Sequence, residues 1–549
     1  MHFKPLKAET GPRPKDWGRC FRVALVYPNS YRVGMGNLGL HAVYSAINGM
    51  DGMLADRFFV EPGKPGRQSR PASIEREMPV DHYDAVAFTA QFEADYPAIV
   101  SFLISAGMKT ASIDRTDGDL YVIAGGPSIS ANPAPLSGFI DAIFVGEFEK
   151  GGSDLLACLR RNKSMGLDRH EALDSLADLP HVYVPSSPRC ALPVRASRPS
   201  LAGMSPPATV IHSTAAEFSD MHLVEFSRGC PSGCRFCMAG FTARPYRIFD
   251  EALITKAALG QRHRDKIGAV GELSAAHPAF ASISSVIDKS GRRISPSSVR
   301  LDLMDQRFME GIARSGQRTL TLAPETPSPR LSRAINKEFD EALFLDRIGA
   351  TVAAGVENIR LYMMTGLPGE TDEDTAMIAG LALKVLQIVC KVGGRSRLGK
   401  LTLSVNPFIP KPWTPLQWAS METPQEIARR FSIISDGLKG EPNLELKLAS
   451  IDESVWEAAL ARADSTAAPI LERAAKTGWR RTVKQEIADP SSPLLDWATR
   501  SRMADEIFPW EVVSHGCSRE YLRLEYNRFL NAEPTPPCDP GTCRACGAC

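Results

Sequence analysis

Short apolar runs alternate with helical patterns in two separate parts of the chain, and this alternation constrains the fold more than any other feature. In the first part, four runs rich in β-branched and aromatic residues end in glycine, proline or polar turns, as strands do. They are FRVALVYP (21–28), YDAVAFTA (83–90), LYVIAGG (120–126) and DAIFVGE (141–147). Strands joined by helical stretches predict a parallel sheet in a doubly wound, Rossmann-like domain. Its ligand crevice should lie beyond the carboxyl ends of the strands.

The second part, from about residue 220 to 440, repeats the alternation with six candidate strands. They are MHLVEFS (221–227), KIGAVGE (266–272), SSVRLDLM (297–304), TLTLAPE (319–325), NIRLYMMTG (358–366) and KLTLSVNPF (400–408). Six such units in succession predict a partial (β/α)6 barrel of the TIM type. In such a barrel the active-site groups occupy the loops that follow the strands.

The overall class is therefore α/β, with four expected regions. Residues 1–150 are expected to form the Rossmann-like domain and residues 216–440 the barrel. Between them, residues 151–215 lose the alternation and become rich in proline and serine, which predicts a linker along the surface. Residues 441–549 show apolar residues at helical spacing and end in a cysteine-rich tail, which predicts a mainly helical region.

Charge and hydropathy narrow the class of protein. The 64 basic and 63 acidic residues give a formal net charge of +1, so no global field favours nucleic acid or a membrane surface. The first 20 residues lack the apolar core of a signal peptide. The longest apolar run, MIAGLALKVLQIVC (377–390), is short for a membrane span and contains Lys384, which favours a buried helix. We therefore expect a cytoplasmic protein.

A reducing compartment implies that the twelve cysteines are thiols and not disulfides. Cys20, Cys158, Cys190 and Cys390 are scattered and are interpreted as small buried hydrophobic residues. The other cysteines cluster in two places, which predicts metal chemistry there.

The first cluster lies in EFSRGCPSGCRFCMAGFTARPYR (225–247), where Cys230, Cys234 and Cys237 follow the first barrel strand. Soft thiolates select zinc, copper(I) or iron–sulfur clusters. A structural zinc site requires four closed ligands, and this loop offers three. An iron–sulfur cubane held by three cysteines leaves one iron open, so the absent fourth ligand becomes a coordination site for a substrate.

This C-x3-C-x-aromatic-C pattern, with Phe236 as the aromatic residue, resembles the signature of the radical S-adenosylmethionine (SAM) superfamily. The resemblance implies an enzyme in which a [4Fe–4S] cluster chelates SAM and cleaves it reductively to a 5′-deoxyadenosyl radical. It also implies a one-electron reductant as partner, such as flavodoxin or ferredoxin.

Further barrel segments resemble the same superfamily. Gly271 and Glu272 match two positions of the Gly-Gly-Glu turn that meets the amino group of SAM, although Val270 replaces the first glycine. Glu325 and Arg330 match positions that approach the ribose and carboxylate. Gly366, in YMMTGLPGETDED (362–374), matches the turn near the adenine. The resemblance implies that these residues bind the cofactor.

The first domain contains Gly34, Gly36 and Gly39 as G-x-G-x-x-G, but a Pro-Asn-Ser turn separates the motif from its strand, which disfavours a dinucleotide site. The domain instead resembles the cobalamin-binding-like domain found ahead of radical SAM barrels, with Gly125 and Gly126 in its Gly-Gly-Pro turn. The Asp-x-His-x-x-Gly motif that donates a histidine to cobalt is absent, and His41 is interpreted as structural. The resemblance implies that cobalamin binds without that histidine.

The second cysteine cluster ends the chain. CDPGTCRACGAC places Cys538, Cys543, Cys546 and Cys549 at C-x4-C-x2-C-x2-C spacing, which predicts four metal ligands. An auxiliary iron–sulfur cluster and a four-cysteine zinc site both fit this spacing. Cys517, upstream in VSHGCSREY, is a further candidate ligand.

Together these features favour a radical SAM enzyme that methylates an unactivated carbon with the help of cobalamin. One alternative is a cobalamin-independent sulfur insertion, methylthiolation or rearrangement that uses the terminal cluster. Another is an iron–sulfur protein for electron transfer or sensing. A nucleic acid, peptide, lipid or small metabolite would each fit as substrate. Arg235, Arg244 and Arg247 near the first cluster are interpreted as fixing the loop or holding the cofactor carboxylate.

Overall fold

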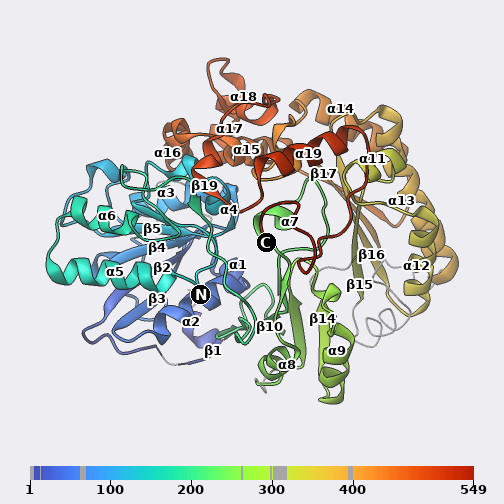
Figure 1. Cartoon of the computed structure of the whole chain (residues 1–549). Coiled ribbons are helices and arrows are strands. Elements are labelled where there is room, and N and C mark those ends of the chain that lie inside the picture. Colours follow the sequence, from blue (N-terminus) through green and yellow to red (C-terminus); the bar gives the residue numbers. More distant parts are fainter. Residues whose placement is uncertain are drawn as a thin grey trace. The chain divides into compact units, whose positions relative to one another are not determined.

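The computed structural model describes residues 5–12, 14–61, 70–260, 264–296, 300, 318–393 and 400–549. The chain forms two compact units (Figure 1). The first unit contains residues 1–224, 459–494 and 507–516, and the second contains residues 225–458, 495–506 and 517–549. The C-terminal region therefore contributes to both units, and the observed division differs from the four predicted regions.

The first unit is built on a six-stranded sheet in the order β3-β2-β4-β5-β6-β7. Its strands are β2 (Phe21–Tyr27), β3 (Met53–Phe59), β4 (Ala85–Thr89), β5 (Tyr121–Gly125), β6 (Ala142–Phe144) and β7 (Val182–Tyr183). All pairs are parallel except β6 with β7. The four predicted strands and the doubly wound architecture are confirmed. The strand order places a topological switch point, where ligands bind in such sheets, between β2 and β4.

Strand β3 has no counterpart among the predicted strands, because Asp56 and Arg57 interrupt the apolar run MLADRFF. Both residues are buried in the structure. The Arg57 guanidinium forms ion pairs with Glu75 at 2.6 Å and Glu9 at 2.8 Å. Charged residues inside a strand are compatible with the core when they are paired in this way.

Helices cover the sheet of the first unit (Figure 1). They include α1 (Tyr31–Gly34), α2 (Leu38–Gly49), α3 (Tyr96–Ser105), α4 (Pro127–Ala131), α5 (Gly152–Met165) and α6 (Arg169–Ala177). Helix α16 (Ala468–Thr477) packs on α3, and α17 (Trp479–Ala488) packs on α16. The predicted linker at 151–215 is therefore wrong over its first half, which forms α5, α6 and β7. Leu155 and Leu159 of α5 join the same core as Val23 and Leu25 of β2.

The second unit contains the parallel pair β13-β14 and the parallel sheet β15-β16-β17-β18. Strand β10 neighbours β13 in the strand order. The strands are β10 (Met221–Glu225), within which the boundary between the units falls, β13 (Lys266–Val270), β14 (Arg293–Pro296), β15 (Thr319–Glu325), β16 (Asn358–Thr365), β17 (Leu401–Pro407) and β18 (Leu444–Leu448). Five predicted strands are confirmed. The predicted strand 297–304 lies outside the described residues except for Arg300, and β14 directly precedes it. Strand β18 falls in the region predicted as helical.

Helices separate these strands in sequence. They are α7 (Ala239–Thr242), α8 (Glu251–Leu259), α9 (Phe280–Lys289), α11 (Pro329–Ala334), α12 (Glu341–Ala353), α13 (Asp372–Gly393) and α14 (Pro424–Gly437), followed by α15 (Ile451–Arg462), α18 (Leu494–Thr499) and α19 (Arg519–Leu530). Because the paired strands are parallel, the loops that follow them open at a common edge, as in a TIM-type barrel.

Helix α13 contains the apolar run noted in the sequence. By length and composition, the segment Asp372–Val392 is long and apolar enough to cross a membrane. Within the protein, 44% of an 18-residue stretch of this segment is buried. Ile378, Leu381, Ala382 and Val385 are almost fully buried. The helix packs beside α12 and α14, as the core helix of a globular unit does.

Candidate active site

The loop with the first cysteine cluster is closed at its base by two short antiparallel strands. β11 (Ser227–Arg228) pairs with β12 (Arg247–Ile248), so the chain leaves the barrel and returns to it at nearly the same place. Gly229 has a φ of +75°, and a Cβ there would lie 2.5 Å from the carbonyl oxygen of Ala243. Only glycine fits this close approach of the two ends of the loop.

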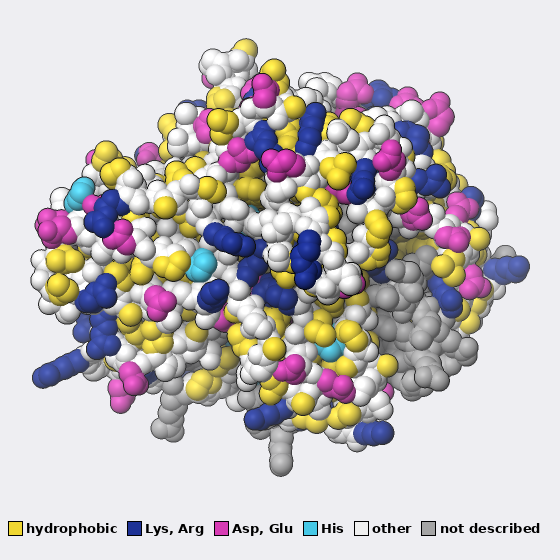
Figure 2. All heavy atoms as spheres, viewed as in Figure 1, with side chains coloured by type: hydrophobic (Ala, Val, Ile, Leu, Met, Phe, Trp, Pro, Cys, Tyr) yellow, Lys and Arg dark blue, Asp and Glu magenta, His cyan; other side chains and the backbone are white. Residues whose placement is uncertain are grey.

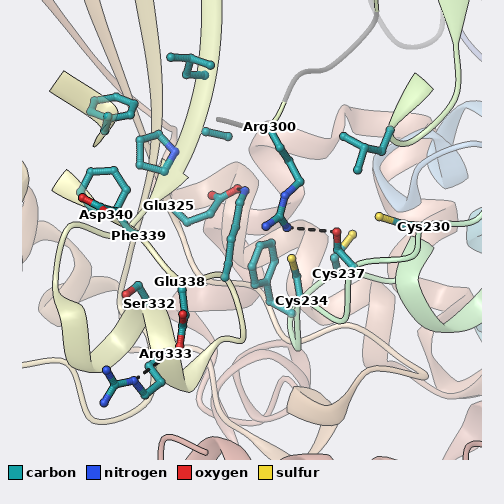
Figure 3. A pocket seen from close by; sticks show the side chains of 18 of the residues that line it. Cys230, Cys234, Cys237, Arg300, Glu325, Ser332, Arg333, Glu338, Phe339 and Asp340 are labelled. Carbon is teal, nitrogen blue, oxygen red and sulfur yellow. Dashed lines mark hydrogen bonds and ion pairs between the residues drawn. The ribbon is translucent and has the colours of Figure 1, made fainter. Parts of the chain in front are cut away.

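The three cysteines line one side of a cavity of about 580 Å³. Figure 3 shows their thiols on one side and Phe339 and Asp340 on the other. The rest of the wall comes from Glu272 and Leu273 after β13, the carboxyl end of β15, and helix α11 with the segment after it. The site therefore lies in the loops after the strands, as the barrel prediction requires.

Each of the three cysteines is half-buried in this wall. Burial raises the pKa of the Cys234 thiol. Burial, followed by the neighbouring Cys234, raises the pKa of Cys237 to about 12. Since the thiolate is the metal ligand, metal binding here must displace protons.

No group of three or more His, Cys, Asp or Glu side chains in the described part of the chain converges as the ligands of one metal ion do. A structural zinc site requires four closed ligands, and this loop supplies three thiols, those of Cys230, Cys234 and Cys237. In an iron–sulfur cubane each thiolate binds its own iron, so the thiols need not converge. The donor set therefore fits a cluster.

Charged side chains of both signs face the cavity. The Lys337 ammonium lies 2.8 Å from a Glu325 carboxylate oxygen, and the Arg300 guanidinium donates to Ser232 Oγ at 3.1 Å. Glu325 has a φ of +70° at an irregularity in the β15–β16 ladder. A non-glycine residue in this conformation is uncommon and is often found at functional sites.

Most of the barrel residues expected from the sequence lie in this cavity. Phe236, Glu272 and Glu325 line it together with the three cysteines. Gly271 directly precedes Glu272, and its position is explained by packing, since a Cβ would lie 2.7 Å from Ser227 Oγ.

Two expected residues lie elsewhere among the described side chains. Arg330 is not part of the cavity wall and instead pairs with Asp374 and donates to the Gly369 carbonyl. Gly366 also lies outside the wall, in a turn with a φ of +79° next to Glu422. Arg333, three residues beyond Arg330, lines the cavity.

The sequence analysis missed several further wall residues, namely Arg300, Ser332, Arg333, Lys337, Glu338 and Asp340. The sequence contained one signal that could have located part of this wall, namely Asn336. Asn336 adopts a positive φ of +54° directly after α11, as asparagine does at helix ends, and this turn brings the chain back so that Lys337 faces Glu325.

Arg235 and Arg244 fix the loop to other segments of the second unit, as interpreted from the sequence. Arg235 is fully buried, pairs with Glu525 at 3.0 Å and donates to the Ala334 carbonyl at 2.7 Å. Arg244 donates to Tyr521 Oη at 3.1 Å. Arg247 donates to the Pro245 carbonyl at 3.3 Å.

In the first unit, Gly126 follows β5 with a φ of +113°, and a Cβ there would lie 2.3 Å from the Ala90 carbonyl oxygen. Gly125 ends β5 beside it. His41 is buried with Nε2 at 3.1 Å from the Met35 carbonyl, and burial lowers its pKa to about 4. Its structural interpretation agrees with this geometry. None of the twelve cysteines, all of which are described, forms a disulfide; Cys158 is buried, while Cys20, Cys190 and Cys390 are half-buried.

A buried carboxylate lies at the switch point of the first unit. Asn29, after β2, donates to Asp95 Oδ1 at 2.9 Å. The other carboxylate oxygen, Oδ2, has no hydrogen-bond partner among the described residues. Burial raises the pKa of Asp95 to about 6. This oxygen is therefore a buried acceptor without a hydrogen-bond donor among the described residues.

Two family models match the chain. One, described as radical SAM proteins, N-terminal, matches residues 39–185, and the other, the radical SAM superfamily, matches residues 224–382. An uncharacterized protein of Methanocaldococcus jannaschii is 25% identical over 466 residues, which cover 82% of this chain and 90% of that protein.

One solved structure shares the fold, and a second matches part of the chain. The radical SAM methyltransferase TsrM from Kitasatospora setae, with tryptophan substrate and a SAM analog bound, is 11% identical, with a TM-score of 0.52 over 85% of this chain and 100% of that chain. A second TsrM structure, with cobalamin and a [4Fe-4S] cluster bound, is 13% identical, with a TM-score of 0.46 over 74% of this chain and 75% of that chain.

The raised pKa of Cys237 predicts how the metal-free protein reacts with iodoacetamide. Because only the thiolate reacts, the rate at Cys237 should rise about tenfold per pH unit from pH 7 to 9 without levelling off. Mass spectrometry of the labelled peptides measures this rate. Exposed Cys543 is the internal control and should react faster throughout. A plateau at Cys237 below pH 9 would contradict the buried, protonated thiol.

Proposed function

The chain belongs to the radical SAM superfamily, and on that premise we propose that it methylates an unactivated carbon of its substrate with cobalamin held by the first unit. Enzymes of the superfamily use a [4Fe–4S] cluster and SAM. When bound, the cluster supplies the electron that breaks the carbon–sulfur bond of SAM and so releases a 5′-deoxyadenosyl radical. The observation that carries the proposal is the cavity where three thiols adjoin charged side chains of both signs.

Cys230, Cys234 and Cys237 are the residues that would hold the cluster. They sit on a loop whose two ends are joined by β11 and β12, and Arg235 inside the loop is fully buried. The scaffold therefore fixes the thiols before the cluster binds, which favours accurate positioning of the reacting groups.

The charged side chains of the cavity complement SAM, which presents an ammonium, a carboxylate and ribose hydroxyls. Glu272 and Glu325 would accept hydrogen bonds from the ammonium or the hydroxyls. Arg300 and Lys337 would bind the carboxylate. Phe236, Leu322 and Phe344 contribute apolar wall that excludes water from a reactive radical.

An external one-electron donor such as flavodoxin or ferredoxin would reduce the cluster. On the face visible in Figure 2, acidic and basic side chains are interspersed over most of the surface. This pattern agrees with the near-zero net charge and gives no broad field of one sign for a nucleic-acid substrate.

The methylation reaction is supported by the first unit. Its parallel sheet has the strand order and switch point of a ligand-binding doubly wound domain. The Oδ2 of Asp95 is buried and lacks a donor among the described residues, and it would accept a hydrogen bond from an amide group of cobalamin that enters beside it. His41 is engaged with Met35, so cobalamin here would bind without this histidine on cobalt. The likeness in fold to TsrM, a radical SAM methyltransferase, extends over 85% of the chain and supports the same two-part architecture.

The first prediction concerns SAM cleavage. Protein reconstituted anaerobically with iron and sulfide should release 5′-deoxyadenosine from SAM after reduction with dithionite, as measured by mass spectrometry. Changing Cys230, Cys234 and Cys237 to alanine should lower the rate below about 1% of wild type, because the electron source is lost. The matched control changes Cys20, Cys190 and Cys390, three other half-buried cysteines, and should keep the activity. Tight SAM binding without cleavage would mean that the substrate gates the reaction, and no binding would refute the assignment.

The second prediction concerns the Glu325–Lys337 pair. Glu325→Gln should weaken SAM binding about tenfold, because one charge-assisted hydrogen bond is lost in a shielded cavity. Calorimetric titration of the clustered protein measures the dissociation constant. Glu341→Gln is the matched control, since Glu341 also pairs with a lysine, Lys384, but lies outside the cavity wall. Equal effects of the two variants would argue against a role of Glu325 in binding SAM.

The third prediction concerns cobalamin. After incubation with hydroxocobalamin and desalting, about one cobalt per chain should remain. The reduced form should show no nitrogen hyperfine splitting from a histidine in its paramagnetic resonance spectrum. Asp95→Asn should lower retention about tenfold, since a buried acceptor is lost, whereas Asp51→Asn at an exposed position should not. Absence of cobalt from the wild-type protein would favour the cobalamin-independent reactions.

A further inference from the structure

We propose that Cys517 is a ligand of a second iron–sulfur cluster, which it forms with Cys538, Cys546 and one of the two exposed cysteines of the tail, Cys543 and Cys549. The terminal motif alone suggests four consecutive ligands. The structure instead adds a fifth thiol, Cys517, from the segment just ahead of α19, and places it beside Cys546.

The evidence begins with two buried thiols that are far apart in sequence. Cys517 and Cys546 are each 4% exposed. The Cys517 side chain interacts with that of Cys546, and the Ser518 N–H donates to the Cys546 carbonyl at 2.8 Å. Ser518 caps α19, so the start of a regular helix positions Cys517. Cys538 is close enough to Cys543, Cys546 and Cys549 to interact electrostatically with them.

A buried cation beside these thiols points to a negatively charged occupant. Arg244 is 4% exposed, and its guanidinium approaches the Cys546 side chain, Tyr521 Oη, and the rings of Phe241 and Tyr521. None of the contacts described for it involves a carboxylate, and its Nε has no hydrogen-bond partner within the described residues. A buried charge without a counter-ion is costly. A cluster held by four thiolates is anionic and would supply that counter-charge.

The spacing of the tail cysteines favours a cluster over a zinc ion. The run C-x4-C-x2-C-x2-C resembles the cysteine runs that hold iron–sulfur clusters in ferredoxins. A four-cysteine zinc site binds the same number of thiolates, so metal analysis distinguishes the two occupants.

The tail that would carry this second cluster is fastened to the first cysteine loop. The Cys538 N–H donates to the carbonyl of Pro231, the neighbour of Cys230, at 2.7 Å. The Asn336 amide donates to the carbonyls of both Gly233 and Thr535, at 3.2 and 3.1 Å. The terminal thiols therefore belong to an ordered part of the second unit, whose backbone contacts the loop of the first cluster directly.

The test removes the first cluster so that the two centres cannot be confused. The full chain with Cys230, Cys234 and Cys237 changed to alanine is reconstituted anaerobically with iron and sulfide and desalted. About four irons and four sulfides per chain should remain, with a paramagnetic signal after reduction by dithionite. This outcome does not depend on SAM cleavage or on cobalamin, so it stands or fails separately from the proposed function.

Adding Cys517→Ser to that background should lower the bound iron below about one per chain and abolish the signal, whereas Cys390→Ser should change neither. Cys546→Ser should behave as Cys517→Ser does. Circular dichroism of the metal-free variants checks their folding, and Cys517→Ala, which keeps a small apolar side chain at this buried position, replaces the serine variant if that one is unfolded. Full iron content in the folded Cys517 variant would overturn the proposal, as would one zinc and no iron in the background protein.

Discussion

The buried ion pair between Arg235 and Glu525 connects the three parts of the second unit on which the chemistry depends. Arg235 lies between Cys234 and Phe236, and Glu525 lies on α19 at a distance of 3.0 Å. The same guanidinium donates to the Ala334 carbonyl at the end of α11 and to the Glu533 carbonyl and Thr535 Oγ1 of the tail. A buried charge is tolerated only when its hydrogen bonds are satisfied, and removal of one partner typically costs about 3–5 kcal/mol. Arg235 therefore holds the cysteine loop, the cavity wall on α11 and the terminal tail in fixed positions relative to one another.

Buried charge organises the first unit in a similar way. Asp141, just ahead of β6, accepts from Arg115 at 3.0 Å and from Arg169 at 2.5 Å, and its Oδ2 also accepts from the Val122 N–H on β5. Arg169 begins α6, so this carboxylate ties a helix to two strands. These networks explain why residues 151–185 belong to the unit although their sequence lacks the strand–helix alternation of the residues before them.

Local sequence patterns predicted the strands and the position of the cavity, because both depend mainly on residues that are close together in the sequence. Apolar runs located nine of the strands, and the spacing of Cys230, Cys234 and Cys237, with the motifs around Glu272 and Glu325, located the cavity. The failures involve distant partners. Strand β3 carries Arg57, whose acids Glu9 and Glu75 lie elsewhere in the chain. Arg330 was expected in the cavity, but its partner Asp374 lies on the next long helix, α13. Likewise the contact between Cys517 and Cys546 forms only after α19 and the tail have folded together.

The cysteine loop combines a backbone held by protein contacts with buried thiols, and these two properties have different causes. Protein contacts hold the backbone, since Arg235 bonds to Glu525, to Thr535 and to the carbonyls of Ala334 and Glu533. Burial raises the pKa values of Cys234 and Cys237, because a site of low dielectric constant stabilises thiolates poorly. Since the thiolate is the metal ligand, the negative charge on these two residues develops only as a cluster enters and the protons leave.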